Sequence, residues 1–113
     1  MATFTKVLLS ESVSGRQIPI VNTATTGNLI HTAHATAQDE VWLYAVNITT
    51  TSVLLTIEWI GVADAFKIMV GVPSRSGYVL VVPGLVITGG NIIRAFADVA
   101  SVINVAGFVN RIT

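Results

Sequence analysis

Residues 39–60 decide the fold, and they read DEVWLYAVNITTTSVLLTIEWI. Two runs rich in β-branched and aromatic residues lie on either side of the polar segment from Asn47 to Ser52. Such runs form strands, and a short polar segment between two of them is typical of a turn. The pattern therefore predicts an antiparallel hairpin, in which residues 53–59 pair with the strand that begins at Glu40.

The two predicted strands differ in the composition of their faces. Successive side chains point to opposite faces of a strand, so every second residue belongs to one face. In the second strand the predicted core face is formed by Val53, Leu55, Ile57 and Trp59. The opposite face, with Leu54, Thr56 and Glu58, is expected to be the half-polar exterior of the sheet. In the first strand both faces are apolar, with Val41, Leu43 and Ala45 on one and Trp42, Tyr44 and Val46 on the other. Both faces of that strand are therefore expected to be covered.

Short apolar runs separated by turn-forming residues continue along the chain, and no segment has the pattern of a long helix. We predict at most nine strands, over residues 3–9, 17–21, 28–33, 40–47, 53–59, 65–70, 78–82, 92–97 and 102–111. Strands at this spacing indicate one all-β domain over residues 1–113, an antiparallel β-sandwich or a jelly roll. Residues 2–21 contain Gly15 and Pro19, which limit regular pairing, so this segment is either an N-terminal arm or an edge strand.

The composition indicates an unusually neutral surface. Apolar residues make up 52% of the chain and charged residues 11%, and six Lys and Arg balance six Asp and Glu. An ordinary domain has roughly 25% charged residues. Residues 78–82 and 102–109 are also apolar on both faces of their predicted strands. Such strands lie either between a sheet and another layer of the chain or against a neighbouring subunit. Large exposed apolar faces mark interaction sites, so we favour the neighbour and expect a homo-oligomer that buries them.

Nucleic acid and membrane are not expected partners. A nucleic-acid interface needs a basic stripe. The cationic residues are instead scattered singly, as Lys6, Arg16, Lys67, Arg75, Arg94 and Arg111. The most hydrophobic stretch without a charge, residues 76–93, is interrupted by Pro and Gly well short of a membrane helix of about 20 residues. The N-terminus alternates like a strand and lacks the pattern of a signal peptide, so we expect synthesis in the cytoplasm.

No combination of residues indicates a catalytic, cofactor or metal site. The chain has no cysteine, which excludes thiolate ligands and cysteine nucleophiles. His31 and His34 lie three residues apart, and such residues point to opposite faces of a strand, so they would not converge on a metal ion. Serines and aspartates such as Ser10 and Asp39 are present, but none lies in a nucleophile-elbow sequence. We therefore expect no enzyme activity, no cofactor and no metal.

Two other short motifs have structural interpretations. Asp39 and Glu40 are adjacent carboxylates at the start of a strand, a position that favours a solvated strand entrance or a charged edge over a glycosidase pair. The segment Gly89-Gly90-Asn91 precedes a β-branched run and no helix, so it indicates a hairpin turn and not a phosphate-binding loop.

The aromatic residues indicate where a partner binds. Trp59 shares the predicted core face of its strand, whereas Trp42 and Tyr44 lie together on one face of another strand. The candidate protein-interface residues are Trp42, Tyr44, Tyr78, Leu80, Val82 and Phe108. Sugar stacking on the same aromatic rings is an open alternative.

Three phrases of the sequence resemble small virion structural proteins of tailed bacteriophages. They are DEVWLYA at residues 39–45, LTIEW at residues 55–59 and AGFVNRI at residues 106–112. The resemblance covers most of residues 28–113 and includes no catalytic motif. Small β-rich phage proteins of this kind include capsid decoration, or cement, proteins, which are commonly trimers on the outside of the head.

The resemblance implies a location and a partner. It implies a non-enzymatic protein on the capsid surface of a virion, where it binds the major capsid protein or another virion protein and stabilises the head. It implies a trimer as the form of the expected homo-oligomer. A tail, baseplate or fibre component has the same chemistry, and so does a carbohydrate-binding β-sandwich module, so these alternatives remain open.

Overall fold

The predicted strands are all present in residues 2–113, the part of the chain that the computed structural model describes. The elements are β1 (Phe4–Leu8), β2 (Ile18–Ile20), β3 (Asn28–Thr32), β4 (Gln38–Asn47), β5 (Val53–Trp59), η1 (Asp64–Phe66), β6 (Lys67–Val72), β7 (Val79–Ile87), β8 (Ile92–Ala97) and β9 (Ile103–Ile112). The only helical element among these residues is the single 3₁₀ turn η1. No helix in the described residues is long and apolar enough to cross a membrane.

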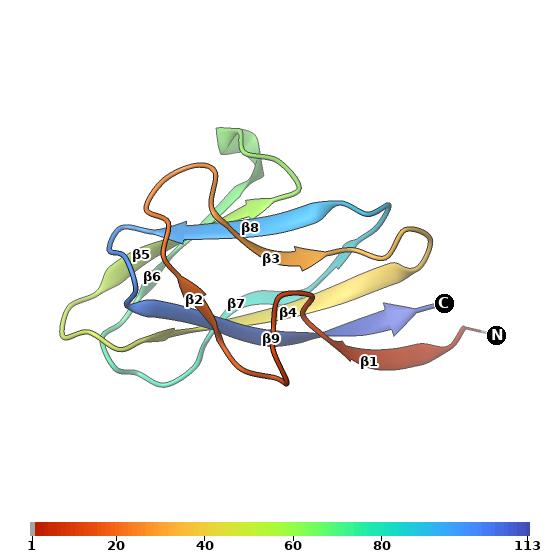
Figure 1. The fold of residues 1–113 in the computed structure, drawn as a ribbon, viewed down its shortest axis with the longest axis horizontal. Helices are drawn as coiled ribbons and strands as arrows, with labels where there is room; N and C mark the ends of the chain where they lie inside the picture. Colours follow the sequence, from red (N-terminus) through yellow and green to blue (C-terminus); the bar gives the residue numbers. More distant parts are fainter. Residues whose placement is uncertain (1) are drawn as a thin grey trace.

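The strands form two antiparallel sheets that pack face to face (Figure 1). One sheet has the order β1-β9-β4-β7, with β2 also pairing with β9, and the other has the order β3-β8-β5-β6. Apart from β1 to β2 and β5 to β6, every connection carries the chain from one sheet to the other. The order β2-β9-β4-β7 opposite β3-β8-β5-β6 is that of a jelly roll made of two Greek keys. The predicted all-β sandwich is therefore confirmed.

The hairpin predicted from residues 39–60 is wrong. β4 pairs with β7 and β9, whereas β5 pairs with β6 and β8, so the two strands lie inside different sheets. The buried Asn47 side chain fixes this crossing, because its Nδ2 donates to the carbonyl oxygens of Thr51 and Val72, each at 2.9 Å. Val72 ends β6 in the second sheet, so this bond directs the chain away from β4. The turn at Gly89-Gly90-Asn91 likewise crosses from β7 to β8 and is not a hairpin.

The core lies between the inward faces of the two sheets. From β4 and β5 it receives Val41, Leu43, Ala45, Val53, Leu55 and Ile57, all at most 2% exposed. The predicted core face of β5 is confirmed for its first three apolar residues. Trp59 is only partly buried and packs against the rim of the core. This rim position follows from its place at the last residue of the strand.

Strand β7 continues past its predicted end, through Pro83 and Gly84 to Ile87. It lies at the edge of its sheet, where a proline without an N–H group is tolerated. The register with β4 shifts on both sides of Trp42 and Leu43, which accommodates the irregular segment. Gly84 adopts a φ of 77°, and a Cβ at this position would lie 2.9 Å from Cζ2 of Trp42. Glycine therefore permits both the turn of the backbone and the close approach of the indole.

Residues 2–21 form the other edge of the five-stranded sheet. β1 pairs with residues 108–112 of β9, and β2 pairs with residues 103–105 of the same strand. The two chain ends lie side by side (Figure 1), because Thr3 and Thr113 exchange two backbone hydrogen bonds of 2.9 and 3.0 Å. Residues 2–21 were expected to be either an N-terminal arm or an edge strand, and in the single chain they form edge strands.

Candidate interaction surface

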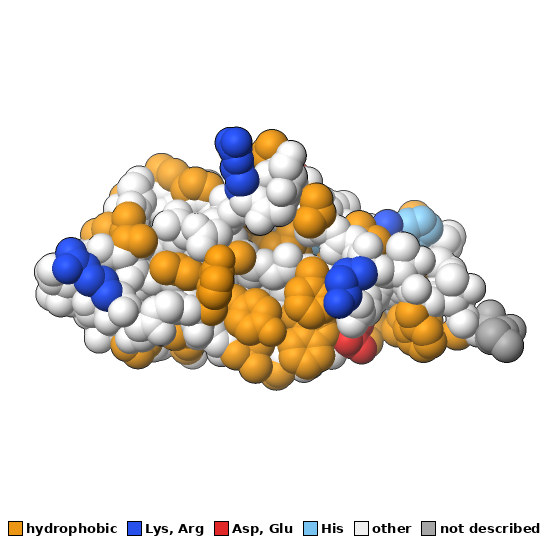
Figure 2. Space-filling model, turned by 90° about the horizontal axis from the view of Figure 1, so that it is seen from below, with side chains coloured by type: hydrophobic (Ala, Val, Ile, Leu, Met, Phe, Trp, Pro, Cys, Tyr) orange, Lys and Arg blue, Asp and Glu red, His pale blue; other side chains and the backbone are white. Residues whose placement is uncertain are grey.

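The outer face of the five-stranded sheet carries apolar side chains in rows that run across its strands. The register places Leu8, Phe108, Trp42 and Pro83 in one row, and Ala106, Tyr44 and Leu80 in the next. Figure 2 looks onto this side of the molecule and shows hydrophobic side chains gathered at its centre, with few charged groups around them. We call these two rows, together with Tyr78 at the start of β7, the aromatic face.

Trp42 is held in place at the centre of the aromatic face. Its ring stacks on Phe108 with the ring centroids 6.1 Å apart and an angle of 12° between the planes. Its Nε1 donates a hydrogen bond of 2.7 Å to Oε1 of Glu40. Gly84 lies against the indole from the neighbouring strand, where any larger residue would collide with it. The indole is therefore ordered before any partner binds.

One cation and one anion flank the aromatic rings. Nζ of Lys6 lies 4.9 Å from the centroid of the Phe108 ring, a cation–π contact. On the other side of β9, Oε1 of Glu40 accepts hydrogen bonds from Trp42 and from Asn110, and these bonds lower the pKa of Glu40. Glu40 is therefore ionised at neutral pH, and the two charges balance each other across the face.

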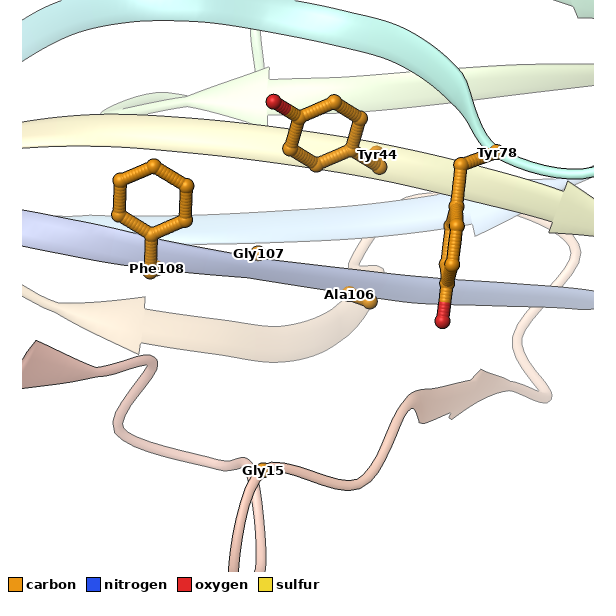
Figure 3. Close-up of a pocket in the computed structure, with 6 residues that line it drawn as sticks. All are labelled: Gly15, Tyr44, Tyr78, Ala106, Gly107 and Phe108. Carbon is orange, nitrogen blue, oxygen red and sulfur yellow. The ribbon is translucent and has the colours of Figure 1, made fainter.

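A pocket of about 290 Å³ opens within the aromatic face (Figure 3). It is lined by Gly15, Tyr44, Tyr78, Ala106, Gly107 and Phe108, none of which is charged. The small residues of β9 lie between the rings, and the Tyr78 ring stands across from Phe108 in Figure 3. The rings of Tyr44 and Tyr78 meet edge to face, with centroids 6.2 Å apart and planes at 70°. Nε2 of Gln17 donates a hydrogen bond of 2.9 Å to the Tyr78 hydroxyl at the rim.

The structure brings most of the predicted interface residues to this surface. Tyr78 is 61% exposed and Leu80 is 47% exposed, while Trp42, Tyr44 and Phe108 are half-buried side by side. Val82 is different, because its side chain is fully buried in the core. The register shift between β4 and β7 places Val82 opposite the inward-facing Leu43. Its prediction as an interface residue is therefore wrong.

A second cluster, made of polar side chains around the buried pair His31 and Asp39, lies at one end of the sandwich. Nε2 of His31 lies 2.8 Å from Oδ2 of Asp39, and both residues are at most 1% exposed. Arg111 donates to the two carboxylate oxygens of Asp39 through Nε at 2.8 Å and through a terminal guanidinium nitrogen at 3.1 Å. Oγ of Ser10 lies 2.8 Å from Nδ1 of the same histidine. The cluster joins the segment after β1 to β3, β4 and β9.

Asp39 is buried and ionised within this cluster, so the expectation of a solvated strand entrance is wrong for this residue. Burial by itself raises the pKa of the carboxyl group, but hydrogen bonds from Arg111, His31 and the backbone N–H of His34, with the charge of Arg111, outweigh it and lower the pKa to about 2. The same contact raises the pKa of Arg111. Because an ionised carboxylate can only accept, Nε2 of His31 donates to Asp39, while Nδ1 accepts the backbone N–H of Ser10.

The side chains of Ser10, His31 and Asp39 contact one another in space as those of a hydrolytic triad do, with the histidine in the middle. We nevertheless interpret the arrangement as structural. The backbone N–H of Ser10 donates to the same Nδ1 at 3.0 Å, so the lone pair that a general base would use is already engaged. Oγ of Ser10 also accepts a hydrogen bond of 3.0 Å from the backbone N–H of Thr32. Ser10 does not line the aromatic pocket, which lies on the outer face of the sheet. The sequence does not predict this cluster, because its members come from four separate segments.

The second histidine belongs to a local turn. Nδ1 of His34 accepts hydrogen bonds from the backbone N–H groups of Thr36 and Ala37, at 3.1 and 2.9 Å. The imidazole rings of His31 and His34 therefore have different partners, although the backbone N–H of His34 also donates to Asp39. Within residues 2–113, no group of three His, Cys, Asp or Glu side chains is placed to hold a metal ion.

No protein-family model, curated protein or solved structure matches this chain. The fold by itself does not identify a function, because jelly rolls serve in capsids, lectins and enzymes alike. The aromatic face and its pocket are the features from which a function is argued.

Proposed function

We propose that the protein is a non-enzymatic structural subunit that binds another protein through its aromatic face. The observation that carries this proposal is a continuous apolar surface that remains open to solvent, with Tyr78 and Leu80 61% and 47% exposed. Contiguous apolar surfaces of this kind are uncommon on monomers and are typical of contact sites. The balanced charges of Lys6 and Glu40 at its margin favour a neutral, apolar partner surface.

The residue types and their rigidity suit protein binding. Tyrosine and tryptophan supply much of the binding energy at protein interfaces, because they bury a large area with few rotatable bonds. Trp42 is already fixed by Phe108 and Glu40, so little side-chain entropy is lost when a partner covers it. A stable contact buries about 800 Å² on each partner, an area that requires most of the aromatic face and not the pocket alone.

The proposed partner is a subunit of a bacteriophage virion. The resemblance of residues 39–45 and 106–112 to phage structural proteins supports this choice, and these residues supply the two central strands beneath the aromatic face. On this proposal the protein decorates the outer surface of the capsid, binds the major capsid protein and stabilises the head. A position on the tail, baseplate or fibre is the alternative location.

The proposed form of the protein is a closed homo-oligomer, with the trimer that the resemblance implies. A chain with zero formal net charge has little repulsion to keep copies apart, and a closed ring buries apolar surface without open-ended growth. Light scattering at micromolar concentration measures the number of copies. Because an apolar contact is weakly screened, the same mass is expected at low and high salt.

Co-sedimentation with purified capsids that lack the protein tests the proposed partner. The wild-type chain is expected to sediment with capsids, and Tyr44→Ser is expected to weaken binding roughly thirtyfold, the effect of a residue worth about 2 kcal/mol. Met69→Ser is the matched control, because Met69 is 60% exposed but lies on β6 of the other sheet. Equal binding by both variants contradicts the role of the aromatic face. A chain that binds neither capsids nor tails contradicts the virion partner.

Binding of a neutral sugar is a second candidate function, and the pocket is the observation that favours it. Aromatic rings offer faces for the apolar side of a sugar ring, and the Tyr78 hydroxyl and the Gln17 amide stand at the rim as hydrogen-bonding groups. Trp42 stacks on the pocket residue Phe108, so its fluorescence is a built-in reporter. Titration with maltoheptaose and cellohexaose to millimolar concentration is expected to change this fluorescence, and Tyr78→Ala to abolish the change. An unchanged spectrum with both oligosaccharides contradicts this function.

A further inference from the structure

Strand β1 contributes little to the core. Phe4 and Leu8 are 70% and 48% exposed, and Val7 is the member of the strand that packs, partly buried, against the core. Each residue of β1 is paired with a residue of β9, from Phe4 opposite Ile112 to Leu8 opposite Phe108. The strand is therefore held mainly by backbone hydrogen bonds along one edge, and little apolar burial opposes its departure.

The chain becomes firmly anchored directly after β1. Leu9 is 1% exposed in the core. Ser10 bonds to His31 through both its backbone N–H and its hydroxyl oxygen, and the hydroxyl oxygen also accepts from the N–H of Thr32. Segments of low local stability open separately from the rest of a fold. A boundary between a loosely held segment and a fixed one thus lies between Leu8 and Leu9.

Departure of β1 exposes a specific edge. β2 covers β9 only at residues 103–105, so residues 108–112 lose their neighbour on that side. An unpaired edge is a template for another strand. The strand that matches it best is residues 4–8 of a second copy, because the same register and the same contact of Lys6 with the Phe108 ring are restored.

We propose that β1 is an exchangeable strand, which in the assembled protein pairs with residues 108–112 of β9 in a second copy of the chain. Exchange of an identical element restores every contact that the closed monomer makes, so it costs little and yields a defined oligomer. Each copy donates its β1 to the next copy and receives β1 from the previous one. In a closed ring every copy then has its edge of β9 paired. Strand β1 supplies Leu8 to the aromatic face, and exchange places Leu8 of the second copy opposite Phe108 again. The aromatic face is therefore complete with or without exchange, and either proposal stands without the other.

Disulfide trapping tests the exchange, since the chain has no cysteine of its own. Lys6 and Asn110 face each other across β1 and β9, and antiparallel neighbours lie within the Cα distance that a disulfide spans. Lys6→Cys and Asn110→Cys are prepared as separate full-length proteins, one with a size tag, then mixed at high concentration and oxidised. A mixed dimer on a non-reducing gel is the expected result.

The same row of the sheet provides the matched control. Glu40 also faces Asn110, but from the central strand β4 on the other side of β9. Mixing Glu40→Cys with Asn110→Cys is expected to give no mixed dimer, because β4 cannot leave the sheet without unfolding the domain. The double variant Lys6→Cys with Asn110→Cys, oxidised in dilute solution, is expected to form an intrachain bond and verifies the geometry.

Two results would overturn the proposal. One is the absence of a mixed Lys6–Asn110 dimer beyond the level of the Glu40 control, while the double variant closes normally. The other is equal cross-linking of both pairs, which identifies contact between two aromatic faces in place of strand exchange. Capsid co-sedimentation of the wild-type chain is measured separately, so failure of exchange is distinguishable from failure of the proposed function.

Discussion

Strands β4 and β5 occupy equivalent interior positions in the two sheets, yet their outer faces are covered in different ways. On β5, the outward-facing Thr56 and Glu58 are each only 2% exposed, so the expected half-polar exterior is wrong for these two residues. The chain's own β2–β3 loop reaches Glu58, where the N–H of Gly27 and the hydroxyl of Thr25 donate hydrogen bonds of 2.7 and 2.9 Å to the carboxylate. On β4, Trp42 and Tyr44 remain half-exposed within the aromatic face.

The difference shows how the chemistry of an outer face selects what covers it. A carboxylate accepts hydrogen bonds from the N–H and O–H groups of a loop, so a polar outer residue binds the chain's own backbone. Aromatic side chains offer few such bonds and are covered most favourably by another apolar surface. The sheet that contains β5 is therefore partly closed by its own chain, whereas the sheet that contains β4 is left available to a partner.

The largest effect on stability is expected from Asp39→Ala at the start of β4. Removing the carboxylate leaves His31 buried without its partner and Arg111 without its ion pair, and breaking such a buried pair costs about 3 kcal/mol in the free energy of unfolding. Urea denaturation followed by tryptophan fluorescence measures the change. Asp64→Ala is the control, because the Asp64 side chain is 97% exposed and its pair with Lys67 lies at the surface. Equal stability of the two variants contradicts a structural role for the cluster.

A smaller loss is expected when Asp39 is titrated in the wild-type chain. Its pKa falls from the usual 3.8 to about 2 in the folded protein. A carboxyl group whose pKa is lowered by folding stabilises the fold at every pH above its pKa in the unfolded chain. This contribution of about 2 kcal/mol disappears as the pH falls through the pKa of the folded protein. The free energy of unfolding is therefore expected to drop between pH 4 and pH 2, and Asp39→Asn to lack that part of the drop. Parallel pH curves for the two proteins would contradict the assignment.

Glu58→Ala tests how the β2–β3 loop is held over the outer face of β5. The N–H of Gly27 loses its acceptor in a buried position, which costs about 1.5 kcal/mol. Amide hydrogen exchange at Gly27 is expected to accelerate, while binding through the aromatic face of the other sheet stays at the wild-type level. A variant that loses partner binding without losing stability would show that the two faces are not independent.

The smallest effect is expected from Ser10→Ala, which tests the interpretation of the polar cluster. The substitution removes the hydroxyl contact with Nδ1 of His31 and the acceptor of the Thr32 N–H, but the backbone N–H of Ser10 still donates to Nδ1, so the cost is about 1 kcal/mol. We expect the wild-type chain and the variant to hydrolyse p-nitrophenyl acetate no faster than the His34→Ala control. Hydrolysis that depends on Ser10 would establish an activity and overturn the non-enzymatic proposal.

Local features of the sequence predict the strands well and their partners poorly. The signals that define β5 are the alternation in residues 53–59 and the turn residues on either side of it. These signals lie in neighbouring residues, so β5 is predicted with its observed limits. The prediction that β4 and β5 pair fails, because a polar segment between two strands has the same composition whether the chain turns back or crosses to the other sheet. The decisive contact, from Asn47 to the carbonyl of Val72, joins residues that are 25 positions apart.

The sequence by itself determined the all-β class, the positions of the strands, the apolar character of both faces of β4 and the neutral surface. These properties follow from residue type and from a period of two, and both are local. Only the tertiary structure decided that Val82 points inward, that Leu8, Phe108 and Trp42 form one row, and that Ser10, His31 and Asp39 meet at one end of the sandwich. The physical reason is that register shifts and strand order are set by contacts between distant segments, which no local pattern encodes.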